Sequence, residues 1–203
     1  EVWVGDDAVA HDAFLQSCAD VLRQTAQRGY VAFMPGNRDF LVGPDFLSAC
    51  GMHALADPTL LEMGTSRILL THGDALCLDD NDYQAFRRKV RQPSWQREFL
   101  AKPLDERLAL ARAMRAQSEL KMRTDTVYAD ADTAMALNWL GSAAASALVH
   151  GHTHQPADHA LGTGVRHVLS DWSLDHEPRR AEVMRLDASG GMRRLSITNA
   201  TGS

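Results

Sequence analysis

The sequence has few of the features typical of membrane-spanning, secreted or disulfide-bonded proteins. Its 203 residues include no apolar run long enough to span a membrane, and no signal peptide is visible. Cysteine is scarce, and Cys18, Cys50 and Cys77 are odd in number and lack metal-site spacing. We therefore expect reduced thiols in a cytoplasmic protein. Aromatic residues make up only 6%, and there is no internal repeat or low-complexity segment.

The composition is that of a soluble folded protein. Hydrophobic residues make up 45% and charged residues 23%, enough for one core or a core with a small cap. The net charge is −5, yet residues 81–123 hold 11 Lys and Arg against 5 Asp and Glu. This basic segment is either a solvated helical face or a surface facing an anionic substrate. Nucleic-acid binding has little support, because the rest of the chain is acidic and the basic segment has few aromatic residues.

Apolar periodicity predicts an α/β fold with an inserted helical segment. Residues 80–123 show no strand pattern, and apolar residues recur there at helical intervals, which predicts three helices. The other expected helices are 12–28, Pro44 to about Gly51, and 129–140; the expected strands are 30–34, 59–63, 67–71, 145–149, 157–161, 165–170, 181–186 and 192–197. The run at 30–34 reads as a strand covered on both faces. We expect a layered core of residues 1–79 and 124–203 and a helical cap of residues 80–123.

Three of the expected strands end in residues that can bind metal. Gly36–Asp39 contains Asn37, Thr71–Asp74 contains His72, and Gly151–His154 contains His152 and His154. On extended backbone the two histidines of His-x-His point the same way. Neutral imidazoles and an amide oxygen suit borderline divalent ions such as Mn, Fe or Zn. Two such ions could clamp a phosphate and activate a water.

This donor set is short of carboxylates. Asp39 and Asp74 are candidates, although both also suit a role in orienting the neighbouring ligands. Asn37 could be a turn former, but the following Arg-Asp favours ligation. His150 precedes the motif on its strand and suits packing or an orienting role. We assign no site role to the remaining histidines, which are His11, His53, His159, His167 and His176.

These motifs together resemble those of calcineurin-like metallophosphoesterases. Arg38, where that family usually has His, resembles one branch, the UDP-2,3-diacylglucosamine diphosphatases of lipid A biosynthesis. Trp3–Asp7, His72–Asp80, Tyr83–Arg87 and Asp171-Trp172 also match that branch. The resemblance covers nearly the whole chain and implies a layered β-sandwich core flanked by helices. It also implies two upstream strands, ending in Asp-x-His and Gly-Asp, that the sequence does not include and that would supply the missing carboxylates.

The resemblance implies a metal-dependent hydrolase that uses two divalent ions, with Mn²⁺ expected. Asn37, His72 and His152 resemble ligands of the second metal, and His154 a ligand of the first. Arg38 would contact the diphosphate. Water would attack the phosphorus nearer the uridine, giving UMP and 2,3-diacylglucosamine 1-phosphate. Catalysis would rest on Asn37, Arg38, His72 and His152, and both Asn37 and His152 would also touch substrate.

The resemblance also gives the helical cap a role. Asp80 and Ser118 resemble contacts to the glucosamine, although Asp80 could equally cap the following helix. The branch commonly shows Ser-x-x-x-Asn-x-x-Lys; the sequence departs from it after Ser118, where Lys121 or Arg123 would substitute. Apolar cap residues could house acyl chains: Phe86, Trp95, Phe99, Leu104 and Leu108. The basic face would dock on the anionic cytoplasmic face of the inner membrane, as a peripheral protein. No protein partner is implied.

Two alternatives remain. One is another phosphoesterase of the superfamily that acts on nucleotides or phosphodiesters; Gly-Asn-Arg-Asp and the basic cap argue against it. The other is a catalytically inactive scaffold that keeps one metal site.

Overall fold

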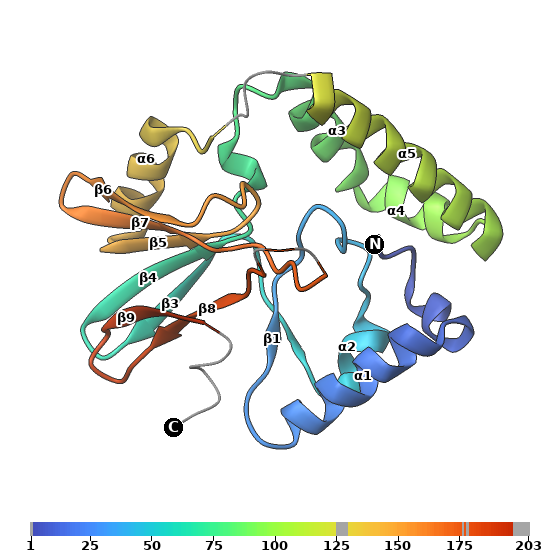
Figure 1. Cartoon of the computed structure of the whole chain (residues 1–203), viewed down its shortest axis with the longest axis horizontal. Coiled ribbons are helices and arrows are strands. Elements are labelled where there is room, and N and C mark those ends of the chain that lie inside the picture. The colour runs from blue at the N-terminus through green and yellow to red at the C-terminus, as the bar shows by residue number, and fades with distance from the viewer. Residues whose placement is uncertain (1, 125–129, 176, 178, 197–203) are drawn as a thin grey trace. The chain divides into compact units, whose positions relative to one another are not determined.

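In a computed structural model, described over residues 2–124, 130–175, 177 and 179–196, the chain is a mixed α/β protein with a central multi-strand sheet (Figure 1). Residues 117–124 are described as backbone only. The chain divides into two compact units, Glu1–Ala56 with Asp80–Tyr128 and Asp57–Asp79 with Ala129–Ser203. We describe each unit by itself. The expected division into a core and a cap at residues 80–123 stays a prediction.

The second unit is built on a five-stranded sheet. Its strand order is β3 (Thr59–Met63), β4 (Ser66–Thr71), β5 (Ala147–His150), β7 (Gly164–Val168) and β6 (Ala157–Leu161). β4, β5 and β7 run parallel, while β3 and β6 are antiparallel edge strands. All four residues of β5 are buried, as expected for a central parallel strand that reads as an apolar run.

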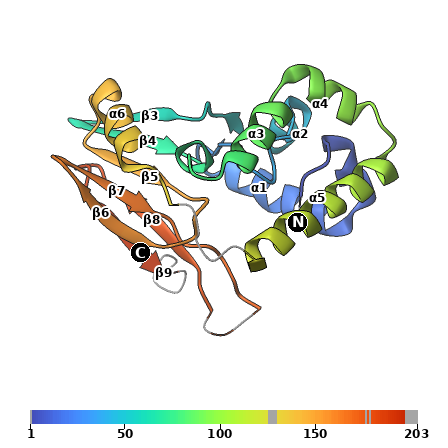
Figure 2. The same ribbon diagram turned by 90° about the horizontal axis from the view of Figure 1, so that it is seen from above.

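Both faces of this sheet are covered. Leu69 and Leu148 point to one face, where they pack with Leu140 of helix α6 (Thr133–Ala143). Ile68 and Val149, one residue along each strand, point to the other face with Leu186. This second face is covered by the hairpin of β8 (Glu182–Leu186) and β9 (Met192–Ser196), as Figures 1 and 2 show. Helix, sheet and hairpin therefore form the expected layers.

The first unit is mostly helical. It contains the 3₁₀ helix η1 (Asp6–His11), α1 (Ala13–Ala26), α2 (Pro44–Cys50) and the short parallel pair β1 (Ala32–Phe33) and β2 (His53–Ala54). α2 begins at Pro44 and ends at Gly51, whose φ of +69° suits glycine. The predicted strand at 30–34 is shorter than expected, and Ala32 and Phe33 are half-buried. The half-burial of both residues shows that the run is not a strand covered on both faces, and β2 is its only partner among the described strands.

The three predicted helices of residues 80–123 are present in the same unit. They are α3 (Asn81–Val90), α4 (Pro93–Leu100) and α5 (Leu104–Thr124), shown together in Figure 2. Phe99 and Ala111 pack with Val4 and Leu41 in one core cluster, against which Leu104 and Leu108 also lie. The Leu104–Leu108–Ala111 face is thus core, as its spacing predicts.

Cys18, Cys50 and Cys77 form no disulfide bond, as predicted, and Cys50 and Cys77 are buried. No helix among the described residues is long and apolar enough to cross a membrane.

Candidate functional site

The turn that carries His72 is held by Asp57. The Thr71 hydroxyl donates to Asp57 Oδ1 at 2.5 Å, and the His72 backbone N–H donates to the same oxygen at 3.2 Å. Thr71 Oγ1 in turn accepts from the Gly73 N–H at 3.2 Å. These bonds fix the backbone where β4 ends and so set the direction from which His72 leaves the sheet.

Gly73 lets this turn pack against the second histidine motif. Its φ is +105°, and a Cβ there would lie 2.8 Å from His150 Nδ1 and 3.2 Å from the Gly151 carbonyl oxygen. The Gly151 N–H donates to the His72 carbonyl at 3.0 Å, extending the pairing of β4 and β5 beyond the strands. A side chain at position 73 would push the two motifs apart.

The prediction of extended backbone at His152 and His154 is wrong. β5 ends at His150, and His152 and His154 have φ values of +65° and +54°. The Thr153 N–H donates to the Gly151 carbonyl at 2.8 Å, which closes a three-residue turn around His152. Non-glycine residues seldom adopt this region, so the turn depends on the contacts around it.

This turn brings His152 beside His72. Their ring centroids are 5.1 Å apart, with planes inclined at 68°. Burial lowers the pKa of His152 to about 4, with the neighbouring charge of His72 adding to it and the Asp74 carboxylate opposing it. The His152 imidazole is therefore neutral at neutral pH and keeps a lone pair for a metal ion.

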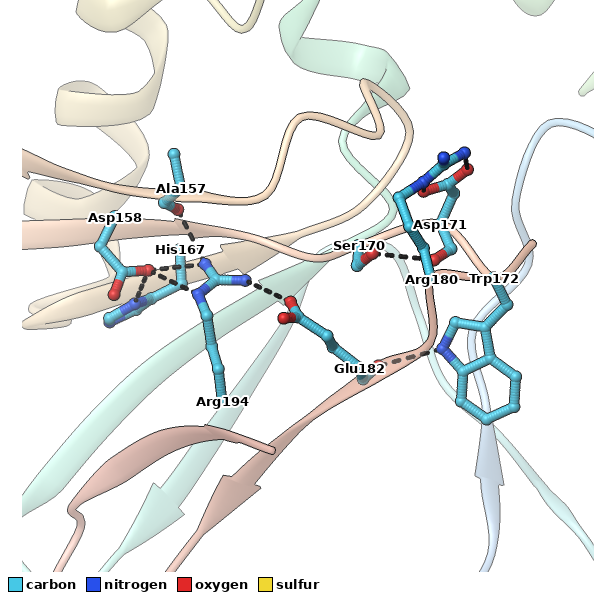
Figure 3. Close-up of polar contacts among 9 residues, drawn as sticks. All are labelled: Ala157, Asp158, His167, Ser170, Asp171, Trp172, Arg180, Glu182 and Arg194. Carbon is cyan, nitrogen blue, oxygen red and sulfur yellow. Dashed lines mark hydrogen bonds and ion pairs between the residues drawn. The ribbon is translucent and has the colours of Figure 1, made fainter. Parts of the chain in front are cut away.

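His154 is exposed on the same loop, and the segment after β7 comes near it. The Asp171 carboxylate pairs with Arg180 through two hydrogen bonds of 2.9 and 2.7 Å, as Figure 3 shows. The Arg180 guanidinium lowers the pKa of Asp171, and the charge of His154 adds to this effect. The Trp172 indole N–H donates to the Glu182 carbonyl at 3.0 Å. Both residues of the Asp171-Trp172 motif are therefore held by hydrogen bonds.

Asn37 and Arg38 lie on a braced loop of the first unit. Asp39 Oδ1 accepts from the Gly36 N–H at 2.5 Å, and Arg91 donates to the Gly36 carbonyl at 3.0 Å. Arg38 is exposed and Asn37 half-buried. Asp39 therefore shapes the loop, one of the two roles predicted for it. The structure unites His72 and His152, whereas the joining of Asn37 and Arg38 with them stays a prediction.

The predicted substrate contacts of the cap are less fully described. Asp80 Oδ1 accepts from the Tyr83 N–H at 3.1 Å and caps α3. Its contact with glucosamine stays a prediction beside this structural role. Ser118 and Lys121 lie on α5, and their side chains fall outside the described residues.

Sequence reasoning missed two groups that support the histidines. One is Asp57, which no motif marked. The other is the buried Arg166 on β7, which pairs with Asp130 and lies beside His150. Alternation along β7 puts Arg166 on the same buried face as Val168. A charged residue at a core position of a strand is a signal that could have revealed it.

The donors present fit a divalent ion in type. His72 and His152 offer two adjacent imidazoles, and the second is held neutral by burial. In the described part of the chain, no three His, Cys, Asp or Glu side chains gather as a metal site. The resemblance assigns the remaining ligands to Asn37, His154 and the upstream Asp-x-His and Gly-Asp motifs, so the histidine pair would form part of the full coordination.

Several relatives of this chain are named UDP-2,3-diacylglucosamine hydrolase. The chain is 42% identical over 197 residues to a UDP-2,3-diacylglucosamine hydrolase of Bordetella pertussis, in an alignment that covers 94% of this chain and 76% of that protein. Proteins of the same name from Chromobacterium violaceum and Xanthomonas campestris are 43% and 39% identical, over 98% and 94% of this chain and 82% and 79% of theirs. No family model matches the chain.

One solved structure, an archaeal phosphodiesterase, is similar at 12% identity with a TM-score of 0.43, over 91% of this chain and 76% of that one. That likeness is too low to support an inference.

The relatives that are 42% and 43% identical over more than nine-tenths of the chain define a hydrolase. The chain belongs to the UDP-2,3-diacylglucosamine hydrolase family.

Proposed function

We propose that the chain hydrolyses the diphosphate of UDP-2,3-diacylglucosamine, giving UMP and 2,3-diacylglucosamine 1-phosphate in lipid A biosynthesis. The observation that carries the proposal is the 42% identity over 94% of the chain to a protein named for this substrate. The adjacent imidazoles of His72 and His152 agree with it, because phosphate-ester chemistry at neutral pH suits a divalent-metal site.

Asn37, His72, His152 and His154 would hold two divalent ions, with Mn²⁺ expected. When bound, such ions lower the pKa of an attacking water and offset the charge that develops on the phosphoryl oxygens. His72 would present its ring from the turn fixed by Asp57, and His152 from the turn closed at Gly151. Both rings are thus oriented before substrate arrives.

Arg38 would bind the diphosphate. Arg38 is exposed on its loop, and Asp39 and Arg91 hold the loop through hydrogen bonds to the Gly36 backbone. A planar cation with several donors matches phosphate oxygens in pairs, which a lysine cannot do. Asp80, Ser118 and Lys121 would contact the glucosamine 1-phosphate part of the substrate.

The acyl chains would be held by the helices of residues 81–123. A pocket of about 280 Å³ is lined by Trp95, Phe99, Leu110 and Met114, together with the charged residues Lys89, Glu98 and Lys102. The Trp95 and Phe99 rings stack at 5.0 Å. The size is close to the lower end of the range for small-molecule sites, roughly 300–1,000 Å³. Of the five residues predicted for this role, Trp95 and Phe99 line the pocket, while Leu104 and Leu108 pack against the core. Phe86 is exposed beside Tyr83 and does not line this pocket.

The first test measures UMP release from UDP-2,3-diacylglucosamine by the full-length protein. We expect release with added Mn²⁺, none with a chelator, and loss in His72→Ala, because that variant removes one of the two paired imidazoles. Folding of the variant is checked by circular dichroism. No release from folded, metal-loaded protein would reject the proposal. Cleavage of generic phosphodiesters instead would favour another branch of the superfamily, and no cleavage at all an inactive scaffold.

A further inference from the structure

A buried arginine lies behind the loop that carries His152. Arg166 is only 4% exposed, in the middle of β7. Its guanidinium makes two parallel hydrogen bonds to Asp130, Nη1 to Oδ1 at 2.9 Å and Nη2 to Oδ2 at 3.0 Å. Asp130 lies just before α6, whose N-cap is Asp132. A charge in the core of a sheet is costly, so the pairing holds the guanidinium in one orientation.

The same guanidinium determines which nitrogen of His150 carries the proton. Arg166 Nη1 is 3.5 Å from His150 Nε2. Arginine has donors and no acceptor, so Nε2 must accept in this contact. The neutral ring then carries its proton on Nδ1, which is 2.9 Å from the Gly151 carbonyl oxygen and donates to it.

The Gly151 carbonyl in turn closes the turn at His152. It accepts from His150 Nδ1 on one side and from the Thr153 N–H on the other. Between them lies His152, with its φ of +65°. His150 itself is wholly buried, so its ring cannot move aside to release the carbonyl.

We propose that Asp130, Arg166 and His150 form a positioning chain that holds the Gly151 carbonyl and thereby aims the His152 imidazole at the bound metal. The three residues act through His152 and do not themselves touch metal or substrate. The inference rests on the proposed function, since it gives the chain a ligand to aim. It goes beyond that function because it assigns a role to three residues outside the histidine, Asn37 and Arg38 motifs.

A buried ion pair that served only the fold would not affect metal binding in protein that remains folded. The chain offers a matched comparison in the second unit. Arg194 of β9 donates to Asp158 of β6 at 2.6 and 3.2 Å, and His167 Nδ1 lies 2.9 Å from the same carboxylate oxygen (Figure 3). This group joins a hairpin to an edge strand, and among the described residues the Gly151 carbonyl has its hydrogen bonds with His150 and Thr153 and none with this group. Arg194→Met therefore serves as the structural control.

The first measurement is the tautomer of His150 in the wild-type protein, from nitrogen–proton correlation spectra of isotope-labelled sample at neutral pH. We expect the proton on Nδ1, although free imidazoles of histidine favour Nε2. A proton on Nε2 would overturn the proposal, because the Gly151 carbonyl would then have no donor in His150. This measurement needs neither metal nor a variant.

The second measurement is the Mn²⁺ affinity of the full-length protein, determined by calorimetric titration with Mn²⁺. His150→Leu should weaken binding about 10- to 100-fold, the range seen when a residue that orients a ligand is lost. His150→Asn keeps a donor near the position of Nδ1, so it should stay within about threefold of wild type, the additivity scatter of such measurements. Asp130→Asn changes a half-exposed side chain, so we expect this variant to fold. It should weaken binding less than His150→Leu.

Unchanged Mn²⁺ affinity in folded His150→Leu or Asp130→Asn would overturn the proposal, and so would an equal loss in Arg194→Met. UMP release is followed in parallel, and we expect kcat to fall more than KM rises, since the chain aims a metal ligand and does not bind substrate. Failure of the proposed function would be seen in the wild type, as absence of UMP release or Mn²⁺ binding. Failure of the positioning chain would be seen only in the variants.

Discussion

At the scale of single residues, the half-exposed carboxylate of Asp130 forms an ion pair with the buried guanidinium of Arg166. Asp130 is 49% exposed while the Arg166 side chain is 5% exposed. The Arg166 guanidinium, together with the Ala131 N–H, lowers the pKa of Asp130 to about 2 from 3.8, against the opposing effect of burial. The ion pair is therefore intact at any pH at which the protein would work.

This pKa predicts a defined acid dependence of stability. A carboxyl group with a lowered folded-state pKa adds stability above its unfolded value of 3.8, and this is lost as the pH falls towards about 2. We expect the urea midpoint of the wild type to fall through this window. Asp130→Asn should show a smaller fall, because its side chain does not titrate. Equal falls in both proteins would show that the pair contributes nothing to acid stability.

Local sequence signals predicted which residues follow the strand ends but not the conformation of the loop that carries His152 and His154. His72 and His152 follow strand ends, as predicted from the apolar runs before them. The positive φ of His152 could not be predicted, because glycine or asparagine is the usual signal for that region. The turn is imposed by hydrogen bonds to Gly151, whose donors come from His150 and Thr153.

At the scale of elements, one buried arginine joins α5 to the N-terminal segment. The Arg107 side chain, 4% exposed, donates to the Val4 carbonyl at 2.6 Å and to the Lys102 carbonyl at 3.0 Å. It also pairs with Asp7, whose carboxylate raises the pKa of the arginine. These bonds connect α5 with residues 4–7, which lie far away in the sequence.

We expect Arg107→Met to destabilise the protein by about 1–3 kcal/mol, because it leaves carbonyl groups without their donor in a buried place. Urea unfolding followed by circular dichroism measures this. Lys102→Met is the matched control, since the Lys102–Glu106 pair is solvent-exposed and contributes little. Equal midpoints for Arg107→Met and wild type would contradict the expectation.

The helices and strands themselves could largely be predicted. Pro44 and Gly51 mark the ends of α2, and apolar alternation marked β6 to β9 to within about two residues, the usual uncertainty of element ends. The run at 30–34 was misjudged, because apolar composition does not say whether both faces of a strand are covered. Tyr30, at the start of that run, is 75% exposed.

At the scale of the whole molecule, charge is divided between segments of the chain. Residues 81–123 carry the excess of basic residues, and Arg88, Arg97 and Arg112 among them are exposed. We propose that this surface attaches the protein peripherally to the anionic cytoplasmic face of the inner membrane, where its acylated substrate would lie.

Replacing Arg88, Arg97 and Arg112 with Gln should weaken binding to anionic liposomes at low salt. Each basic residue near such a surface contributes about 1 kcal/mol, so the loss should approach 100-fold at most. Replacing Arg28, Arg179 and Arg193 changes the net charge equally outside this segment and should have a smaller effect. Cosedimentation at two salt concentrations measures both. Unchanged binding of the first variant would reject membrane docking through this surface.

The sequence by itself determined the α/β class, the positions of most helices and strands, and the residue types of the candidate site. These depend on periodicity, caps and short motifs, which are properties of neighbouring residues. Only the tertiary structure decided that Arg166 meets both Asp130 and His150, and that His152 turns towards His72. The first contact follows from the register of β5 against β7, which pairs Leu148 with Arg166 and His150 with Val168. The second follows from the register of β4 against β5, which pairs Thr71 with His150. A buried polar group takes the partner that this register brings within reach, and no local pattern specifies it.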